Sequence, residues 1–368
     1  MSTKTVIVKP VSSRCNIRCF YCYNATEFRK HDRIPMMSVE LMGQIHEKLP
    51  EFGVDDVTLI WHGGEPLIRG LAFYEAVVSI QKHLRQRFPN LRIVNNVQTN
   101  ATLMTEEWAR FFATNGWRVA TSLDGPEGLH NTFRVDAKGR GTFDRVMAGI
   151  RCAQAAGVSI GFIAVVTSET LKYSPKELYD FWTSVSPHFA VSPCWEASIN
   201  GVSPRYVVDP QGYLAFLKAL FDIWWKNDDS EVTIRPFNGL IQAILGGCGP
   251  TCAYNGSCSD FLSVEADGSV YPCGKFAGVS ELQLGNISKQ SFPAINCSRV
   301  RQDHLTIAGF RPEECRSCRW LKVCNNGCPY DRYRSNGEFE ALSPFCTVRK
   351  GIFEYVDTAI RKTAEWTK

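Results

Sequence analysis

The chain has 368 residues, enough for about two domains or for one large α/β domain with an appendage. Hydrophobic residues make up 44% and charged residues 21%, a balance that excludes the disordered, collagen-like and fibrous classes. The net charge of +4 is spread thinly, and its densest cluster, Arg29, Lys30, His31 and Arg33, lacks interleaved aromatic residues. We therefore expect no nucleic-acid partner, and no membrane partner because the uncharged run 152–168 is polar and broken by glycines.

The first part of the chain alternates between strand-like and helix-like patterns. Short runs rich in β-branched and aromatic residues predict strands at Thr5–Val8, Val57–Trp61, Leu91–Val97, Val119–Leu123, Ile160–Val166 and near Phe189–Val191. Helical periodicity predicts helices at Val39–Leu49, Ala72–Phe88, Glu106–Ala113, Phe143–Ala156, Pro175–Val185 and Gln211–Lys226, with Ser38 and Thr105 as N-caps. This α/β alternation predicts a parallel sheet, either doubly wound or a barrel, and periodicity does not decide between the two.

The composition changes from about Thr233 onward. Most of the fifteen cysteines lie beyond this point, among glycines and prolines rather than periodic apolar positions. Such a segment is expected to fold around metal before it ends in an amphipathic helix at Thr347–Thr363. We therefore predict two domains, 1–232 and 233–368.

The use of cysteine also predicts the compartment. Residues 1–9 lack the apolar segment of a signal peptide and have the pattern of a strand. We therefore expect a cytoplasmic protein, whose cysteines bind metal more readily than they form disulfides.

A compact cysteine array follows the first predicted strand. Cys15, Cys19 and Cys22 have the spacing C-x3-C-x2-C, so three thiolates can converge on one face of an iron-sulfur cluster. The odd number leaves one iron open to a substrate or cofactor. The alternative is a zinc site completed by His31 or by a distant cysteine, since zinc commonly takes four ligands.

This array resembles the signature of the radical S-adenosylmethionine (SAM) superfamily, and Gly63, Gly64, Glu65 and Pro66 after His62 resemble its Gly-Gly-Glu-Pro motif. The same tetrapeptide also suits a plain turn. At a strand end, its glycines would let peptide groups approach and hydrogen-bond the amino end of the cofactor's methionine. The resemblance implies a partial (β/α)6 TIM-type barrel that binds SAM.

Further cofactor-binding residues are implied at later strand ends. The resemblance places polar side chains near the methionine carboxylate and the ribose: Asn100, Ser122 and Asp124. It also suggests side chains that pack on the adenine: Tyr23, Val165 and Trp195. For these last three, an ordinary place in the core is the alternative.

The C-terminal cysteines resemble the SPASM domain of peptide-modifying radical SAM enzymes. The resemblance implies a cysteine-rich domain with two closed 4Fe-4S clusters, and three clusters in all. It assigns an inner cluster to Cys252, Cys258, Cys273 and Cys328, and an outer cluster to Cys315, Cys318, Cys324 and Cys346. Cys248, four residues before Cys252, is a competing ligand.

In length, motif order and cysteine spacing the resemblance is nearest to the anaerobic sulfatase-maturating enzymes, which oxidise a Cys or Ser of a sulfatase to formylglycine. In that group an Asp proposed to take the substrate's proton follows the third inner-cluster cysteine, whereas this chain has Gly274, followed by Lys275. Glycine cannot accept a proton. Asp260 and Glu265 are candidate replacements, although either also suits a turn or the surface.

The glycine therefore favours another reaction, maturation of a ribosomally made peptide by hydrogen abstraction and then oxidative crosslinking or desaturation. Formylglycine formation is the first alternative, and a radical SAM alcohol dehydrogenase the second. Two alternatives are not radical enzymes: an electron-transfer protein and a binding module held together by zinc. The expected partners are a peptide or protein substrate, recognised partly by the linker 196–210, and an external reductant such as flavodoxin or ferredoxin.

Overall fold

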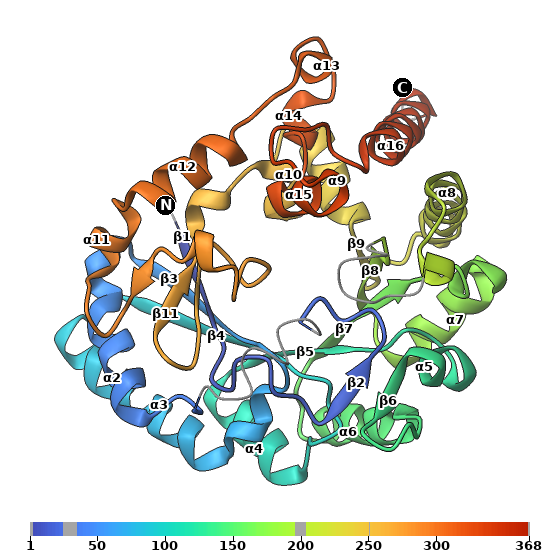
Figure 1. The fold of residues 1–368 in the computed structure, drawn as a ribbon. Helices are drawn as coiled ribbons and strands as arrows, with labels where there is room; N and C mark the ends of the chain where they lie inside the picture. Colours follow the sequence, from blue (N-terminus) through green and yellow to red (C-terminus); the bar gives the residue numbers. More distant parts are fainter. Residues whose placement is uncertain (1–2, 25–34, 196–203, 250, 367–368) are drawn as a thin grey trace. The chain divides into compact units, whose positions relative to one another are not determined.

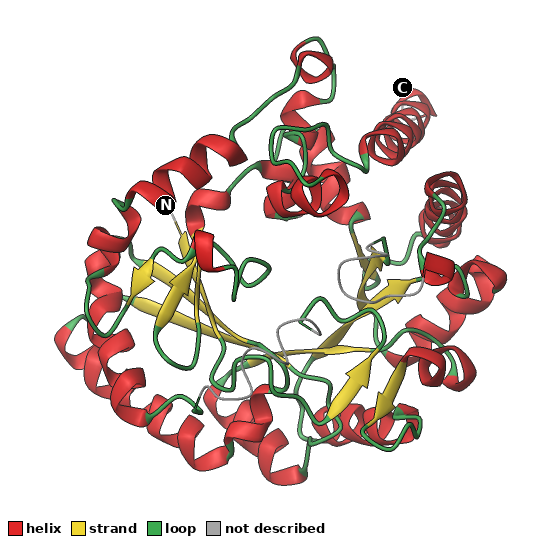
Figure 2. Cartoon of the chain, viewed as in Figure 1, coloured by secondary structure: helices red, strands yellow, loops and turns green. Residues whose placement is uncertain are grey.

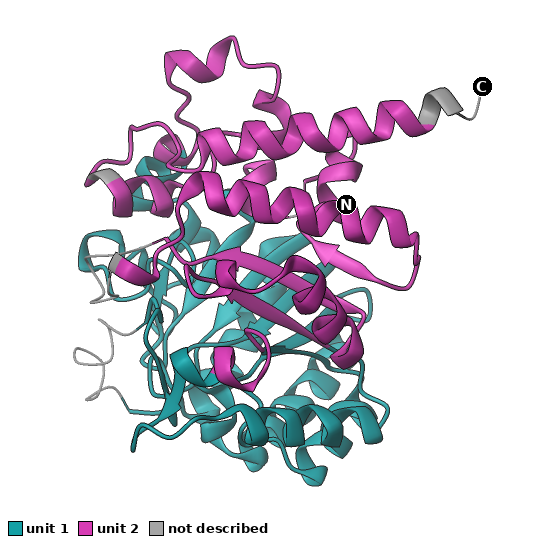
Figure 3. Ribbon diagram, turned by 90° about the vertical axis from the view of Figure 1, so that its right-hand side faces the viewer, with its two compact units in different colours: residues 1–122, 131–160, 258–305 teal, residues 123–130, 161–257, 306–368 magenta. Residues whose placement is uncertain are grey.

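The computed structural model describes residues 3–24, 35–195, 204–249 and 251–366. The basic cluster at 29–33, including the alternative zinc ligand His31, and residues 196–203 of the linker lie outside the described residues. The chain forms two compact units (Figure 3): unit 1 comprises residues 1–122, 131–160 and 258–305, and unit 2 comprises residues 123–130, 161–257 and 306–368. Across the described ranges, no helix is long and apolar enough to cross a membrane.

The strands of unit 1 lie side by side in an order that differs from the chain order. The order is β12 (Gly285–Asn286), β11 (Ser269–Tyr271), β10 (Phe261–Val264), β1 (Thr3–Val8), β3 (Asp56–Trp61), β4 (Arg92–Gln98) and β5 (Arg118–Ser122). Strands β10, β1, β3, β4 and β5 are parallel, whereas β11 and β12 are antiparallel additions. A separate antiparallel pair joins β2 (Ile17–Cys19) to β6 (Arg134–Asp136).

Helices cover one face of these strands (Figures 1 and 2). They are α2 (Val39–Lys48), α3 (Leu71–Arg87), α4 (Glu106–Asn115), α6 (Phe143–Ala155) and α11 (Phe292–Asn296). Alternate strand residues such as Val6, Leu59 and Trp61 are fully buried, as the period-two pattern requires. The predicted N-caps are confirmed, since the Ser38 and Thr105 side chains accept hydrogen bonds from backbone N–H groups of the first helical turn.

Unit 2 contains three parallel strands and the C-terminal helices. The strands are β7 (Ile160–Val166), β8 (His188–Pro193) and β9 (Thr233–Arg235), in that order. The helices are α7 (Pro175–Val185), α8 (Pro210–Asn227), α9 (Phe237–Ile244), α10 (Cys252–Asn255), α13 (Glu313–Arg316), α14 (Leu321–Cys324), α15 (Pro329–Asn336) and α16 (Cys346–Trp366). Helix α16 packs on α8 and α9. Two further helices, α5 (Glu127–Phe133) and α12 (Arg299–Ala308), each begin in one unit and end in the other.

The predicted strands and helices of the first part are confirmed to within about two residues at each end. The compact units, however, do not follow the predicted domain boundary at 232/233. Strand β9 follows that boundary and pairs with β8, while β10 pairs in parallel with β1 and so brings residues 258–305 into unit 1. The cysteine-rich part of the chain is thus divided between the two units.

Candidate active site

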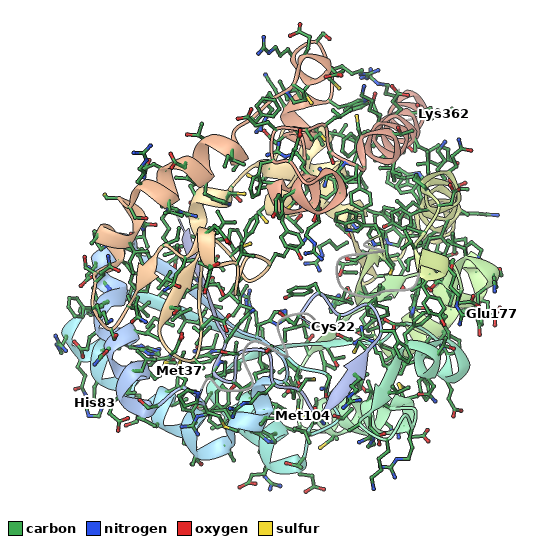
Figure 4. The ribbon with its side chains drawn as sticks, in the orientation of Figure 1. Cys22, Met37, His83, Met104, Glu177 and Lys362 are labelled. Atoms are coloured by element: carbon green, nitrogen blue, oxygen red, sulfur yellow. The ribbon has the colours of Figure 1, made fainter. Side chains whose placement is uncertain are left out.

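The loop with the first three cysteines follows β1 in unit 1. All three thiols are partly buried, and Figure 4 shows Cys22 on the side of the strands away from His83 of α3. Burial, then the Glu65 carboxyl, and then the Cys19 and Cys22 thiols raise the pKa of the Cys15 thiol. A thiol in such surroundings ionises readily only when a cation compensates it. Three such thiols from one loop therefore suit the face of an iron cluster.

The two glycines of the Gly-Gly-Glu-Pro motif lie against this cysteine loop. A Cβ on Gly63, where φ is +117°, would lie 2.4 Å from the Ser12 carbonyl oxygen, and one on Gly64 would lie 1.9 Å from that of Arg14. The Gly64 N–H donates to Ser12 O, and the Glu65 N–H to Arg14 O, each at 2.8 Å. The close backbone approach predicted from the sequence is therefore made to the chain's own loop, and these two amides are already used there.

Glu65 joins the ends of β3 and β4. Its side chain is fully buried and accepts hydrogen bonds from Thr99 Oγ1 at 2.7 Å, from Asn100 N at 2.6 Å and from Leu67 N at 3.0 Å. Burial raises the pKa of Glu65 to about 7, although these donors oppose the shift. Beside it, Pro66 begins a short 3-10 turn and its carbonyl accepts from the Tyr74 hydroxyl at 2.9 Å.

The other predicted cofactor residues of unit 1 lie at strand ends or in the cysteine loop. Asn100 Nδ2 lies 3.6 Å from Cys15 Sγ and donates to Asn16 Oδ1 at 2.9 Å, so the amide lies directly beside the first cysteine. Ser122 ends β5, where its Oγ lies 3.5 Å from Gln98 Nε2. Tyr23 lies close enough to Cys22, Lys275 and Cys273 for each to influence its pKa, which burial raises.

Arg134 lies beside the cysteine loop, although the sequence analysis assigned it no role. Strand β6 pairs Arg134 with Cys19 of β2, and the guanidinium Nη1 lies 3.6 Å from Cys19 Sγ. The guanidinium also lies over the Tyr21 ring, 5.3 Å from its centroid, and the residue is only 6% exposed. A buried cation at this position would stabilise a thiolate or another anion. Strands β2 and β6 have only three residues each, so the sequence pattern does not predict that they pair.

The remaining predicted SAM contacts belong to unit 2. Asp124 is fully buried, and its Oδ1 accepts from the Val165 backbone N–H at 3.1 Å, so it fixes the end of β7. Trp195 is partly buried, and its ring packs edge-on against Phe345 at 5.3 Å between centroids. Their contact with a cofactor remains a prediction.

The structure argues against Asp260 as the catalytic base. Its carboxylate pairs with Lys4 at 3.0 Å, and the side chain is 36% exposed. Lys4 lies near the start of β1 and Asp260 just before β10, whereas the cysteine loop follows the other end of β1. In parallel α/β sheets the reactive groups lie at the carboxyl ends of the strands. Asp260 lies at the amino ends, away from the cysteine loop.

The four cysteines predicted for the outer cluster meet in unit 2. Cys315, Cys318, Cys324 and Cys346 line one cavity, together with Trp320, Asn326, Ser343, Lys350 and Phe353. Burial, followed by the neighbouring thiols, raises the pKa of Cys315. Among the described residues no group has the compact arrangement that holds a single metal ion. Four thiols around a shared cavity instead suit a larger cluster.

The predicted inner-cluster cysteines are distributed between the units. Cys258 and Cys273 belong to unit 1, where both lie near the buried Arg301 guanidinium, which donates to the Cys258 carbonyl at 3.1 Å. Cys252 and Cys328 belong to unit 2. Their shared cluster remains a prediction, and the competing ligand Cys248 is exposed.

Family models match two parts of the chain. The radical SAM superfamily model matches residues 10–176, and the SPASM model, an iron-sulfur cluster-binding domain, matches residues 252–329. Together they span the cysteine loop, the Gly-Gly-Glu-Pro motif and all but one of the predicted auxiliary ligands, Cys346.

Several relatives match almost end to end. A cysteine-type anaerobic sulfatase-maturating enzyme of Clostridium perfringens is 31% identical over 364 residues, which is 96% of both chains. A serine-type enzyme of Bacteroides thetaiotaomicron is 31% identical over 95% of this chain and 88% of its own. The solved structure of native anSMEcpe with bound AdoMet has a TM-score of 0.88 at 29% identity and covers 99% of this chain and 100% of that one.

A more distant solved structure shares the fold alone. Streptococcus suis SuiB, bound to its precursor peptide SuiA, has a TM-score of 0.67 at 17% identity and covers 94% of this chain and 76% of that one. The parallel α/β sheet of the partial-barrel type and the cysteine-rich C-terminal region are therefore those predicted from the sequence. The chain belongs to the radical SAM enzymes with a SPASM domain, in the family of the anaerobic sulfatase-maturating enzymes.

Proposed function

We propose that this enzyme oxidises the side chain of a cysteine or serine in a protein or peptide substrate to the aldehyde of formylglycine. The observation that carries the proposal is the match of 96% of the chain to a cysteine-type anaerobic sulfatase-maturating enzyme. This match favours formylglycine formation, the first alternative of the sequence analysis, over peptide crosslinking.

The reaction removes two electrons from the substrate. A cysteine side chain loses one hydrogen atom from Cβ, the thiol proton and one electron; the resulting thioaldehyde reacts with water to give the aldehyde and hydrogen sulfide. A serine gives the aldehyde directly. When bound, SAM and its cluster would supply the radical that takes the hydrogen atom, and two further clusters would supply an acceptor for the electron.

The chain's own residues would hold and tune these groups. Cys15, Cys19 and Cys22 would bind the SAM cluster, while the Asn100 amide and the Arg134 guanidinium, each 3.6 Å from one of these sulfurs, would stabilise the anionic thiolates. Gly63 and Gly64 would fix the loop. In unit 2, the cysteines that line the common cavity would bind the outer cluster and transfer the electron to or from an external partner such as flavodoxin or ferredoxin.

The test is product analysis with anaerobically reconstituted enzyme, SAM, dithionite and peptides taken from the modified segment of a sulfatase, in Cys and Ser forms. The proposal predicts exchange of CH2SH or CH2OH for CHO, trapping of the product by a hydrazine, and transfer of a Cβ deuterium to 5′-deoxyadenosine. Absence of aldehyde from every sulfatase peptide, although 5′-deoxyadenosine forms, would contradict it.

Peptide crosslinking remains a second candidate because Gly274 replaces the family's Asp. That reaction also removes two hydrogens but keeps the sulfur of a cysteine, and its product does not react with hydrazine. Mass analysis with hydrazine trapping, applied to precursor peptides encoded beside the gene, separates the two reactions.

A further inference from the structure

The buried side chain of Arg301 holds the segment that carries Cys258. Helix α12 begins at Arg299, and the Ser298 hydroxyl accepts from the Arg301 backbone N–H at 3.3 Å, so the start of the helix fixes this arginine in place. Arg301 is only 1% exposed. Its Nη2 donates to three carbonyl oxygens around the start of β10: Cys258 at 3.1 Å, Ser259 at 3.1 Å and Phe261 at 3.0 Å. One end of the guanidinium is thus bound to the backbone.

The other end of the guanidinium lacks such a partner. Arg301 Nη1 is buried and makes no hydrogen bond within the described ranges, and no carboxylate of those ranges forms an ion pair with this side chain. The Asp260 carboxylate is close enough to influence Arg301, but it is paired with Lys4 and its side chain is 36% exposed. A buried cation without its own anion strongly destabilises a fold. The surroundings of Nη1 therefore require a further negative group.

Two of the predicted inner-cluster cysteines flank the hairpin that Arg301 contacts. Cys258 precedes β10 and Cys273 follows β11, and the pairing of Ser263 with Tyr271 brings both cysteines to the same end of this hairpin. Burial lowers the pKa of Arg301, whereas the Cys258 and Cys273 thiols, which are close enough to act on it when ionised, oppose that shift. An iron-sulfur cluster bound by ionised cysteines supplies the negative charge that Nη1 lacks.

We propose that Arg301 is a positioning residue of the inner auxiliary cluster: Nη2 holds the Cys258 segment, and Nη1 offsets the negative charge of the cluster that Cys258 and Cys273 bind. A nearby cation favours the reduced, more negative form of a cluster, so Arg301 raises its reduction potential. A higher potential makes the cluster a better acceptor for the electron that the substrate radical loses. The inference rests on the auxiliary clusters of the proposed function and not on the identity of the product.

The experiment is a redox titration of the full-length, anaerobically reconstituted enzyme followed by EPR, with iron content and aldehyde yield measured on the same samples. Arg301→Met and Arg301→Gln remove the charge, while Arg301→Lys keeps it. Arg299→Met is the matched control, because Arg299 lies in the same helix with its side chain 94% exposed. The EPR signal that disappears when Cys258 and Cys273 are both replaced by alanine identifies the inner cluster.

Both uncharged variants are expected to retain iron and to shift the equilibrium of the inner cluster at least tenfold toward its oxidised form, which is about 59 mV for one electron. Arg301→Lys should stay within about threefold of the wild type, and Arg299→Met within about twofold. An inner-cluster potential that is unchanged in Arg301→Met and Arg301→Gln, or shifted equally in Arg301→Lys, would overturn the inference.

The inference also makes a prediction for variants that fail to hold the cluster. If one uncharged variant loses it, the other decides. Loss from both, with retention in Arg301→Lys, would support the inference, whereas loss from all three would show that Arg301 only shapes the segment and would overturn it. A wild-type enzyme without an inner cluster would overturn it as well. A wild-type enzyme that holds all its clusters but makes no aldehyde would refute the proposed function alone.

Discussion

The contact of Gly64 with the cysteine loop predicts a severe effect of one methyl group. In a Gly64→Ala variant, the new Cβ would lie 1.9 Å from the Arg14 oxygen, 2.3 Å from the Arg14 carbonyl carbon and 2.5 Å from the Ser13 oxygen. All three are backbone atoms and cannot rotate away. Because ordinary Cβ contacts exceed 3.4 Å, the loop and the turn must separate by more than an ångström.

Such a movement breaks the hydrogen bonds from Gly64 N to Ser12 O and from Glu65 N to Arg14 O. At about 1 kcal/mol net for each bond, and more where a buried group is left without a partner, we expect a loss of roughly 2–4 kcal/mol in the free energy of unfolding. The loop that carries Cys15 would also be displaced, so the reconstituted protein should lose about four irons, those of the SAM-binding cluster.

The assay is urea denaturation of the apoprotein, followed by iron analysis after anaerobic reconstitution. Gly43→Ala is the control, because Gly43 lies inside α2 with no atom within 4 Å of the added Cβ. It should raise stability by about 0.5–1 kcal/mol, since alanine is the better helix former. A Gly64→Ala protein as stable and as rich in iron as the control would refute the packing argument.

Three other predictions test single residues. Because the pKa of Glu65 is raised from 4.5 to about 7, the stabilisation of the folded state by its protonated side chain is complete below pH 4.5 and is lost as the pH rises through 7. Over that window the free energy of unfolding of the wild-type apoprotein should fall by about 3 kcal/mol relative to Glu65→Gln. Urea midpoints of the two proteins that run parallel at pH 5, 6 and 7 would contradict this. Arg349 is buried and its Nη1 lies 3.7 Å from Cys324 Sγ, so Arg349→Met should lower the midpoint potential of the outer cluster by about 50–100 mV in a redox titration followed by EPR; an unchanged potential would show that this cation does not influence the cluster. Asp260→Asn should change the rate of aldehyde formation by less than about twofold. It should lower the free energy of unfolding by at most about 1 kcal/mol, because the ion pair of Asp260 with Lys4 is partly exposed. A large loss of product would restore Asp260 as a candidate base.

Local pattern was sufficient for most of the fold. Alternation along β1 and β3, the periodicity of α2 and α4 and their N-caps are interactions within a few residues, and they predicted the elements to within about two residues. The pairing of β10 with β1 joins residues more than 250 positions apart. No local signal reports such a contact, so the predicted domain boundary did not anticipate the compact units.

The site was predictable where a family motif marks it and unpredictable where it depends on tertiary contact. The outer-cluster cysteines were assigned from the resemblance to the SPASM domain, and they meet around one cavity. Asp260 was selected because it is near Cys258 in sequence, but it lies at the opposite end of the strands from the cysteine loop. Arg134 was assigned no role from the sequence, because its importance comes from the cysteine that lies beside it in space.

The account depends most directly on whether Cys15, Cys19 and Cys22 hold a cluster that cleaves SAM. The decisive measurement is 5′-deoxyadenosine formation by the anaerobically reconstituted enzyme with SAM and dithionite, with a variant that has these three cysteines replaced by alanine as the control. The account predicts 5′-deoxyadenosine from the wild type and none from the variant. SAM left intact by an iron-loaded wild type, or cleaved equally by the variant, would contradict it.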